Sequence, residues 1–184
     1  KDKKILILTS VVIKIYSSNR NIDYEHINAK DILDNKYDNV DYWTYTASTD
    51  GKYHVNKKLH KIEVPCDDTL YGTYDKTYKV FKLLNQLNIE YDYILRTNCS
   101  TYINIPLLKL FVNNLNNYRL IYSNSIYCSK DGCGPYQWSL YGLGNSLLLS
   151  KFWVSIIIKN NVNNLTKFNY NKLSTDSVYT VDDN

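Results

Sequence analysis

The residues best suited to chemistry follow an apolar stretch in the segment YDYILRTNCSTYIN, residues 91–104. The pattern predicts a strand over Tyr91–Arg96, with Thr97, Asn98 and Ser100 directly after it. In open α/β sheets, ligands bind beyond the carboxyl ends of the strands. Hydroxyl and amide groups there can orient a polar ligand, and Asn98 and Ser100 could also offer neutral oxygens to a divalent cation. The sequence therefore predicts a ligand site at this strand end.

Acidic residues near the end of the chain are candidates for proton transfer. Asp176, Asp182 and Asp183 lie in the last segment, and a carboxylate beside a reacting hydroxyl can take its proton. A solvated terminus explains the same residues. Asp92, at the start of its strand, is expected to accept hydrogen bonds from backbone donors rather than to bind a ligand.

The elements that must position these residues alternate along the chain. A weak helical pattern covers Tyr24–Leu33, Asp131–Pro135 reads as a Gly-rich loop, and no linker or repeat divides the sequence. We therefore expect a single α/β domain over residues 1–184, with a mostly parallel sheet flanked by helices. The predicted strands are Lys4–Thr9, Asp41–Tyr45, Lys61–Val64, Tyr91–Arg96, Leu120–Ser123 and Ser146–Leu149, and the stronger helices are Asp75–Leu87, Ile105–Leu115 and Lys151–Lys159.

Composition and missing motifs exclude several classes of protein. The net charge of +4 is spread thinly, so no nucleic-acid partner is expected, and no apolar run is long enough to span a membrane. The first strand is not followed by G-x-G-x-x-G, and neither a Walker A motif nor a G-x-S-x-G elbow occurs. The cysteines lack C-x-x-C spacing, which argues against zinc. We expect a soluble domain, with a cytoplasmic compartment favoured over a lumenal one.

Four segments in a fixed order carry a resemblance to a known family. They are DTLYGTYDKT (68–77), YDYILRTNCSTYIN (91–104), PYQWSLYGLGNSLLLSK (135–151) and the acidic pair Asp182–Asp183. Their order resembles the beta-1,3-glycosyltransferases of the fringe and galactosyltransferase type. That resemblance implies a GT-A fold, a UDP-sugar donor, a glycan or protein-linked acceptor, and transfer of a hexose or N-acetylhexosamine, expected with inversion.

The resemblance also implies roles for individual residues. Donor-binding roles fall on Thr9, Ser10, Lys76, Arg96, Thr97, Asn98 and Ser100. Acceptor-binding roles fall on Trp138, Tyr141, Gly144, Asn145 and Ser146. Catalytic roles fall on Asp183, Asp182 and Asp176. The family's helix after the acidic pair is missing here, so we expect a domain truncated at its C-terminus.

One departure from the family pattern bears on the metal. Asn98, Cys99 and Ser100 stand where the family has three aspartates, and neutral oxygens bind Mn²⁺ or Mg²⁺ weakly. Either Asp92 or the diphosphate helps to hold a metal at Asn98 and Ser100, or Lys76, Arg96 or another basic residue neutralises the charge without one. We favour weak or absent metal binding. The alternative function is a catalytically silent module that binds a nucleotide sugar or a glycan.

Overall fold

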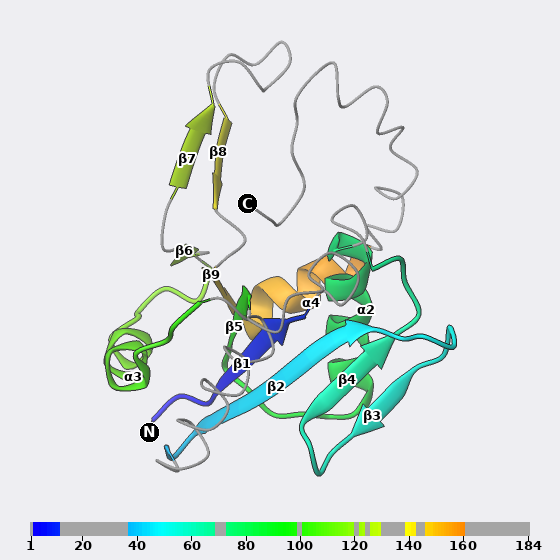
Figure 1. Cartoon of the computed structure of the whole chain (residues 1–184). Helices are drawn as coiled ribbons and strands as arrows, with labels where there is room; N and C mark the ends of the chain where they lie inside the picture. The colour runs from blue at the N-terminus through cyan, green and yellow to red at the C-terminus, as the bar shows by residue number, and fades with distance from the viewer. Residues whose placement is uncertain are drawn as a thin grey trace.

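The computed structural model describes residues 2–11, 37–68, 73–98, 101–119, 122–123, 126–129, 139–142 and 146–160. Its centre is a seven-stranded sheet in the order β3-β4-β2-β1-β5-β9-β6, and β7 pairs only with β8 (Figure 1). The strands of the main sheet are β1 (Ile5–Ser10), β2 (Val40–Ala47), β3 (His54–Asn56), β4 (Lys61–Val64), β5 (Tyr93–Asn98), β6 (Tyr122–Ser123) and β9 (Ser146–Ser150). The small hairpin comprises β7 (Ile126–Ser129) and β8 (Ser139–Gly142).

The four central strands, β4, β2, β1 and β5, run parallel to one another. The outer strands, β3 on one side and β9 and β6 on the other, each run antiparallel to the strand that precedes them toward the edge. β1 pairs in parallel with β2 and β5, and β2 pairs in parallel with β4. β3 joins β4 antiparallel, while β9 joins both β5 and β6 antiparallel. The predicted α/β sheet is confirmed, and its parallel part is the centre. All six residues of β1 are buried, as expected for a strand covered on both faces.

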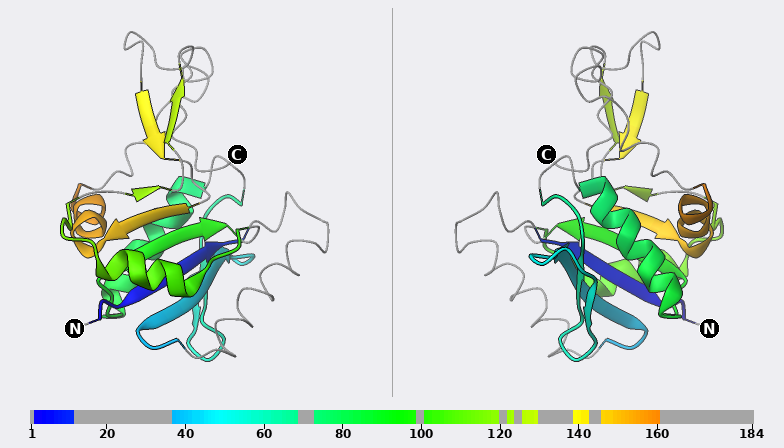
Figure 2. Two further views of the ribbon diagram at one scale, coloured as in Figure 1. Left: turned by 90° about the vertical axis from the view of Figure 1, so that its left-hand side faces the viewer. Right: turned by 90° about the vertical axis from the view of Figure 1, so that its right-hand side faces the viewer.

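Helices cover the two faces of the sheet and create two hydrophobic clusters. Alternate residues of β1 point to opposite faces, so Leu6 and Leu8 enter one cluster and Ile5 and Ile7 enter the other. The first cluster packs against α2 (Thr73–Gln86) and α4 (Lys151–Lys159), and the second packs against α3 (Ile105–Asn113). Figure 2 shows α3 toward the viewer on the left and α2 toward the viewer on the right.

Local sequence explains where the helices begin and which side they bury. Asn104 caps α3, because its side-chain oxygen accepts a hydrogen bond from Leu107 N at 3.1 Å, and Pro106 stands in the first turn where its missing N–H costs nothing. In α2, Val80, Phe81 and Leu84 lie on the buried side, as the helical stripe predicted. No helix in the described part of the chain is long and apolar enough to cross a bilayer.

The predicted elements that fall on described residues are present, with ends shifted by a few residues at most. β4 and α4 have the predicted bounds, whereas β5 begins two residues later than expected and continues to Asn98. Three short strands, β3, β7 and β8, were not predicted. The weak helix expected at Tyr24–Leu33 and the loop at Asp131–Pro135 lie outside the described residues.

Candidate functional site

The candidate site lies at the edge of the sheet where the parallel strands end. Ser10, the last residue of β1, lies opposite Asn98 on β5 and opposite Tyr45 on β2. On the other side of β5, Thr97 lies opposite Ser146, the first residue of the antiparallel β9. Neighbouring strands of a sheet lie about 4.7–4.9 Å apart, so residues at paired positions are close together. The tertiary structure therefore brings Ser10, Asn98 and Ser146, predicted from separate segments, to one edge.

The alternation of side chains along each strand divides the predicted residues between two faces. Ser10 and Asn98 share the face of Leu8 and Ile94, which α2 covers. Thr9 and Thr97 share the face of Ile7 and Leu95, which packs toward α3. The predicted donor-binding residues therefore belong to two neighbouring surfaces of the sheet and do not form one row of ligand contacts.

The depth of these residues differs. Asn98 and Ser146 are half-buried, whereas the side chains of Thr9, Ser10 and Thr97 are buried. Within the described residues, the buried hydroxyls of Thr9 and Ser10 have no hydrogen-bond partner. A buried hydroxyl without a partner costs about 1–3 kcal/mol, so a polar ligand or water that met the Ser10 hydroxyl would be favoured there.

On the α2 face, a buried ion pair fixes the chain around the end of β1. Lys76 of α2 places Nζ 3.2 Å from Asp68 Oδ1, and the two side chains are 0% and 4% exposed. The same Nζ donates a hydrogen bond at 3.2 Å to the carbonyl oxygen of Val11, the residue that follows β1. In this structure the Lys76 ammonium group is thus used inside the protein, and its expected role at a diphosphate stays a prediction.

Arg96 is also used inside the protein. Its Nε donates to the Tyr45 hydroxyl at 3.0 Å, and that hydroxyl lies 2.9 Å from Thr77 Oγ1. Because Arg96 can only donate, the Tyr45 oxygen accepts this bond and its own hydrogen can go to Thr77. The side chain of Arg96 is 1% exposed, and its expected role in neutralising a bound diphosphate stays a prediction. Lys76 and Thr77, the Lys-Thr pair of the sequence motif, thus connect α2 to the end of β1 and to β2.

On the α3 face, a cavity of about 340 Å³ opens beside the strand end. Leu95, Leu148 and Tyr122 lie side by side across β5, β9 and β6, and they form its floor together with Ser146. Its walls come from α3 and the segment before it. The wall residues are Thr101, Tyr102, Ile103, Asn104, Leu108 and Phe111. Of the predicted acceptor residues, Ser146 is the one whose side chain the structure describes, and it lines this cavity.

The residues at the strand end fit a resident metal ion poorly. Within the described residues, no group of three or more His, Cys, Asp or Glu side chains could hold a metal. Asp92 cannot assist Asn98, because it precedes β5 and accepts a hydrogen bond from Lys4 N at 2.7 Å. Six residues of strand separate the two, or about 20 Å at 3.3 Å per residue. This corrects the alternative in which Asp92 helps to hold the ion and confirms its expected bond to a backbone donor.

Several predicted residues lie outside the described part of the chain. They are Ser100, Trp138, Gly144, Asn145, Asp176, Asp182 and Asp183. Tyr141 lies in β8, opposite Tyr127 of β7. The catalytic assignment of the acidic residues therefore stays a prediction.

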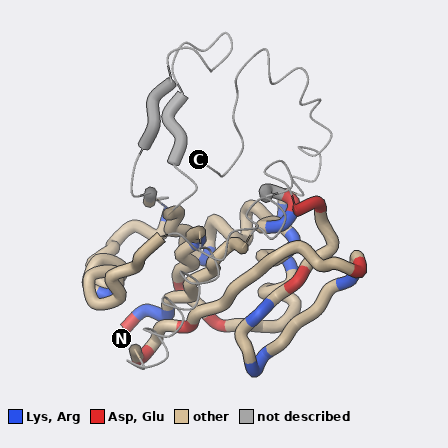
Figure 3. The backbone as a smooth tube through the Cα atoms, viewed as in Figure 1, with Lys and Arg blue, Asp and Glu red and all other residues tan. Residues whose placement is uncertain are grey.

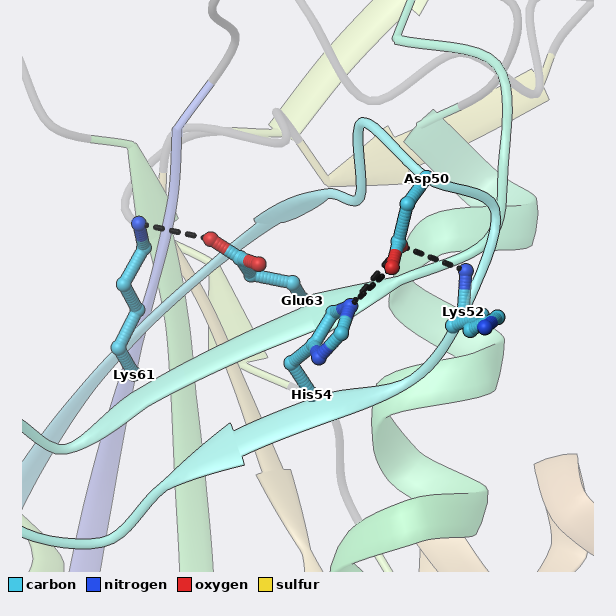
Figure 4. Close-up of polar contacts among 5 residues, drawn as sticks. All are labelled: Asp50, Lys52, His54, Lys61 and Glu63. Carbon is cyan, nitrogen blue, oxygen red and sulfur yellow. Dashed lines mark hydrogen bonds and ion pairs between the residues drawn. The ribbon is translucent and has the colours of Figure 1, made fainter.

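A larger cavity, about 650 Å³, lies along the β3–β4 hairpin at the other edge of the sheet. Its lining includes charges of both signs, with the Lys61–Glu63 ion pair among them. Figure 3 marks basic and acidic residues along the backbone of this hairpin. In Figure 4, His54 points toward Asp50, and their hydrogen bond lowers the pKa of the Asp50 carboxyl. Both side chains are nearly half exposed, and paired exposed charges of this kind are common on surfaces. We therefore take the strand-end edge, not this cavity, as the candidate site.

Comparisons with known proteins support the fold. No family model matches the chain, and no curated protein matches it. Among solved structures, the chain is similar to a glycosyltransferase involved in the glycosylation of the major capsid of PBCV-1, with a TM-score of 0.50 and 11% sequence identity. The match covers 91% of this chain and 69% of that one. This likeness shows the fold, so the expected α/β class, with a main sheet flanked by helices, is confirmed.

Proposed function

We propose that the protein is a glycosyltransferase that moves a sugar from a UDP-sugar to a glycan or protein-linked acceptor. The observation that carries the proposal is the meeting of Ser10, Asn98 and Ser146 at the carboxyl edge of a sheet with a glycosyltransferase fold. This is the edge at which sheets of this class bind ligands. Fold alone does not define an activity, so the proposal rests on these residues as well.

In the proposed site, Asn98 is the principal donor contact. Its amide can both donate and accept hydrogen bonds, which suits the hydroxyls and phosphate oxygens of a nucleotide sugar. Asn98 is half-buried and extends from the last position of β5, whereas the neighbouring Ser10 supplies a buried hydroxyl. Lys76 and Arg96 act indirectly, because their bonds to Val11 and Tyr45 hold the exit of β1 and the end of β5 under α2.

Inversion at the anomeric carbon remains part of the proposal through the acidic residues. A carboxylate of Asp183, Asp182 or Asp176 would take the proton of the acceptor hydroxyl as that hydroxyl attacks the sugar. The proposed reaction includes no metal ion. The amide of Asn98 is a weak ligand for a divalent cation, and the described residues contain no acidic cluster that could hold one.

The same neutral residues favour a second candidate, a module that binds a nucleotide sugar or a glycan without transferring it. A strand end that keeps hydrogen-bonding groups but has no carboxylates can still bind a nucleotide sugar, whereas catalysis needs additional groups that stabilise the transition state. The two candidates share a ligand and differ in turnover.

Calorimetry with UDP, UDP-glucose, UDP-galactose and UDP-N-acetylglucosamine, with and without Mn²⁺, tests the proposal. We expect binding by the wild-type chain and at least about tenfold weaker binding by Asn98→Ala, since hydrogen bonds at such sites contribute on the order of 1.5 kcal/mol. Asn85→Ala, an exposed asparagine near the far end of α2, is the matched control. Absence of binding by the wild-type chain to every nucleotide rejects both candidates.

Turnover separates the two candidates. UDP release from a bound donor, in the presence or absence of a saccharide acceptor, identifies the transferase. If that release disappears in Asp183→Ala while UDP binding remains, the silent module is rejected. Binding without any UDP release by the wild-type chain selects the silent module instead.

A further inference from the structure

The cavity between α3 and the sheet has a lining that the predicted roles do not explain. Its mouth carries two large aromatic side chains, Tyr102 and Phe111, which are 72% and 46% exposed. Phe111 meets Tyr122 edge to face, with ring centroids 5.3 Å apart. These two side chains therefore leave ring surface at the cavity that a ligand could cover.

The cavity combines two kinds of surface in a small volume. Tyr102, Phe111 and Tyr122 provide ring surfaces, and Leu95 and Leu148 provide an apolar floor. Ser146 adds a hydroxyl group from the start of β9. At about 340 Å³, the volume lies at the small end of the range for ligand pockets, which are mostly apolar with a few polar groups that fix orientation.

A saccharide matches this combination better than other small ligands. A pyranose ring has an apolar face of C–H groups, which can lie on an aromatic ring, and a rim of hydroxyls, which can bond to Ser146. No Lys or Arg side chain lines the cavity in the described part of the chain, so a phosphate or nucleotide would find no counter-charge there.

The position of the cavity connects it to the proposed donor site. Ser146 lines the cavity and lies opposite Thr97, the neighbour of Asn98. The cavity floor continues to that strand end through the residue pairs Leu95–Leu148 and Thr97–Ser146. Because β5 ends at Asn98, a saccharide on this floor can reach a donor held there when its reacting hydroxyl extends past the end of the strand.

We propose that this cavity is the acceptor subsite, which binds a mono- or disaccharide with its apolar face on Tyr102 and a hydroxyl toward Ser146. The proposal rests on the proposed function, because it names where that activity takes its acceptor. It adds Tyr102, Phe111 and Tyr122, to which the sequence motifs gave no role, to an acceptor site that those motifs indicated through Ser146. Tyr102 is then the main determinant of acceptor affinity, with no part in donor binding.

Saturation-transfer NMR with lactose, cellobiose and N,N'-diacetylchitobiose, each titrated separately, tests this assignment. We expect at least one of the three to bind the wild-type chain. Tyr102→Ala is expected to weaken that binding about three- to tenfold, the range for loss of one aromatic contact. Tyr53→Ala is the matched control, because Tyr53 is a 49% exposed tyrosine before β3 at the opposite edge of the sheet.

Two further measurements keep the outcome decisive. Ser146→Ala is expected to weaken sugar binding as well, and circular dichroism verifies that each variant is folded. UDP binding, measured by calorimetry on the same proteins, is expected to be unchanged in Tyr102→Ala. The proposal is overturned if none of the three sugars binds, or if Tyr102→Ala binds them as tightly as Tyr53→Ala does. Sugar binding without any UDP binding would reject the proposed function while retaining a saccharide site in this cavity.

Discussion

Lys76 of α2 and Asp68 of the segment after β4 form an ion pair that is almost completely buried, with Nζ 3.2 Å from Oδ1. The same ammonium group reaches the carbonyl of Val11, so one side chain connects α2, the exit of β1 and the exit of β4. These are neighbouring parts of the edge that carries the candidate site. The pair therefore links the stability of the fold to the geometry of that edge.

Replacement of Lys76 by Met tests this link. The substitution removes the cation that pairs with the buried Asp68 carboxylate, which is expected to lower the free energy of unfolding by about 3–5 kcal/mol. Urea denaturation measures the change. Lys61→Met, which breaks the more exposed pair with Glu63, is the control and should cost about 0–1 kcal/mol. Equal losses in the two variants would contradict a structural role for the Lys76–Asp68 pair.

Replacement of Tyr45 by Phe tests the second buried network. It removes the hydroxyl that accepts from Arg96 Nε and contacts Thr77, while the ring stays in the core. We expect a loss of about 1–3 kcal/mol in the free energy of unfolding, because a buried charged donor loses its acceptor. Tyr53→Phe, at an exposed tyrosine, should change stability by less than about 0.5 kcal/mol. A Tyr45→Phe variant as stable as this control would refute the network.

The thiol of Cys66 is expected to react slowly at neutral pH. Partial burial raises its pKa from 9.0 to about 11, because removal of water disfavours the thiolate. Reaction with a disulfide reagent should therefore be slow in the native protein at pH 8 and should accelerate as pH approaches 11. The same chain unfolded in urea should react faster at pH 8. Comparison of the wild-type chain with Cys66→Ala assigns the reaction to this residue.

The raised pKa of Cys66 also predicts a direction for stability. Its contribution is fully present below pH 9.0 and is lost as pH rises toward about 11, because the unfolded chain releases the proton first. The free energy of unfolding should thus fall more steeply between pH 9 and 11 in the wild-type chain than in Cys66→Ala. Parallel profiles for the two proteins would show that Cys66 does not titrate as expected.

Restored carboxylates at the strand end should create metal affinity. The double variant Asn98→Asp with Ser100→Asp supplies two charged oxygen ligands, and we expect Mn²⁺ affinity at least about tenfold above that of the wild-type chain. Electron paramagnetic resonance of free Mn²⁺ measures the binding. Asn113→Asp with Asn114→Asp, which places two carboxylates at the end of α3, is the matched control. Tight Mn²⁺ binding by the wild-type chain would show instead that the neutral residues suffice.

The sequence by itself determined the elements and their order, because period-2 and period-3.6 patterns are local properties of the chain. It also located the polar residues at the end of β5 and identified α3 by Asn104, Pro106 and the apolar positions that follow. The three strands that it missed, β3, β7 and β8, have three or four residues each, too few to establish a period.

Only the tertiary structure decided which residues meet and which are buried. The antiparallel pairing of β9 brings Ser146 opposite Thr97, and no local pattern specifies the direction of a strand. Lys76 and Arg96 look like free cations in the sequence, yet Lys76 forms an ion pair with Asp68 and bonds to Val11, and Arg96 bonds to Tyr45. The cavity beside α3 likewise combines β5, β6 and β9 with Tyr102 and Phe111. These features arise from contacts between residues far apart in the chain, and such contacts leave no periodic trace in the sequence.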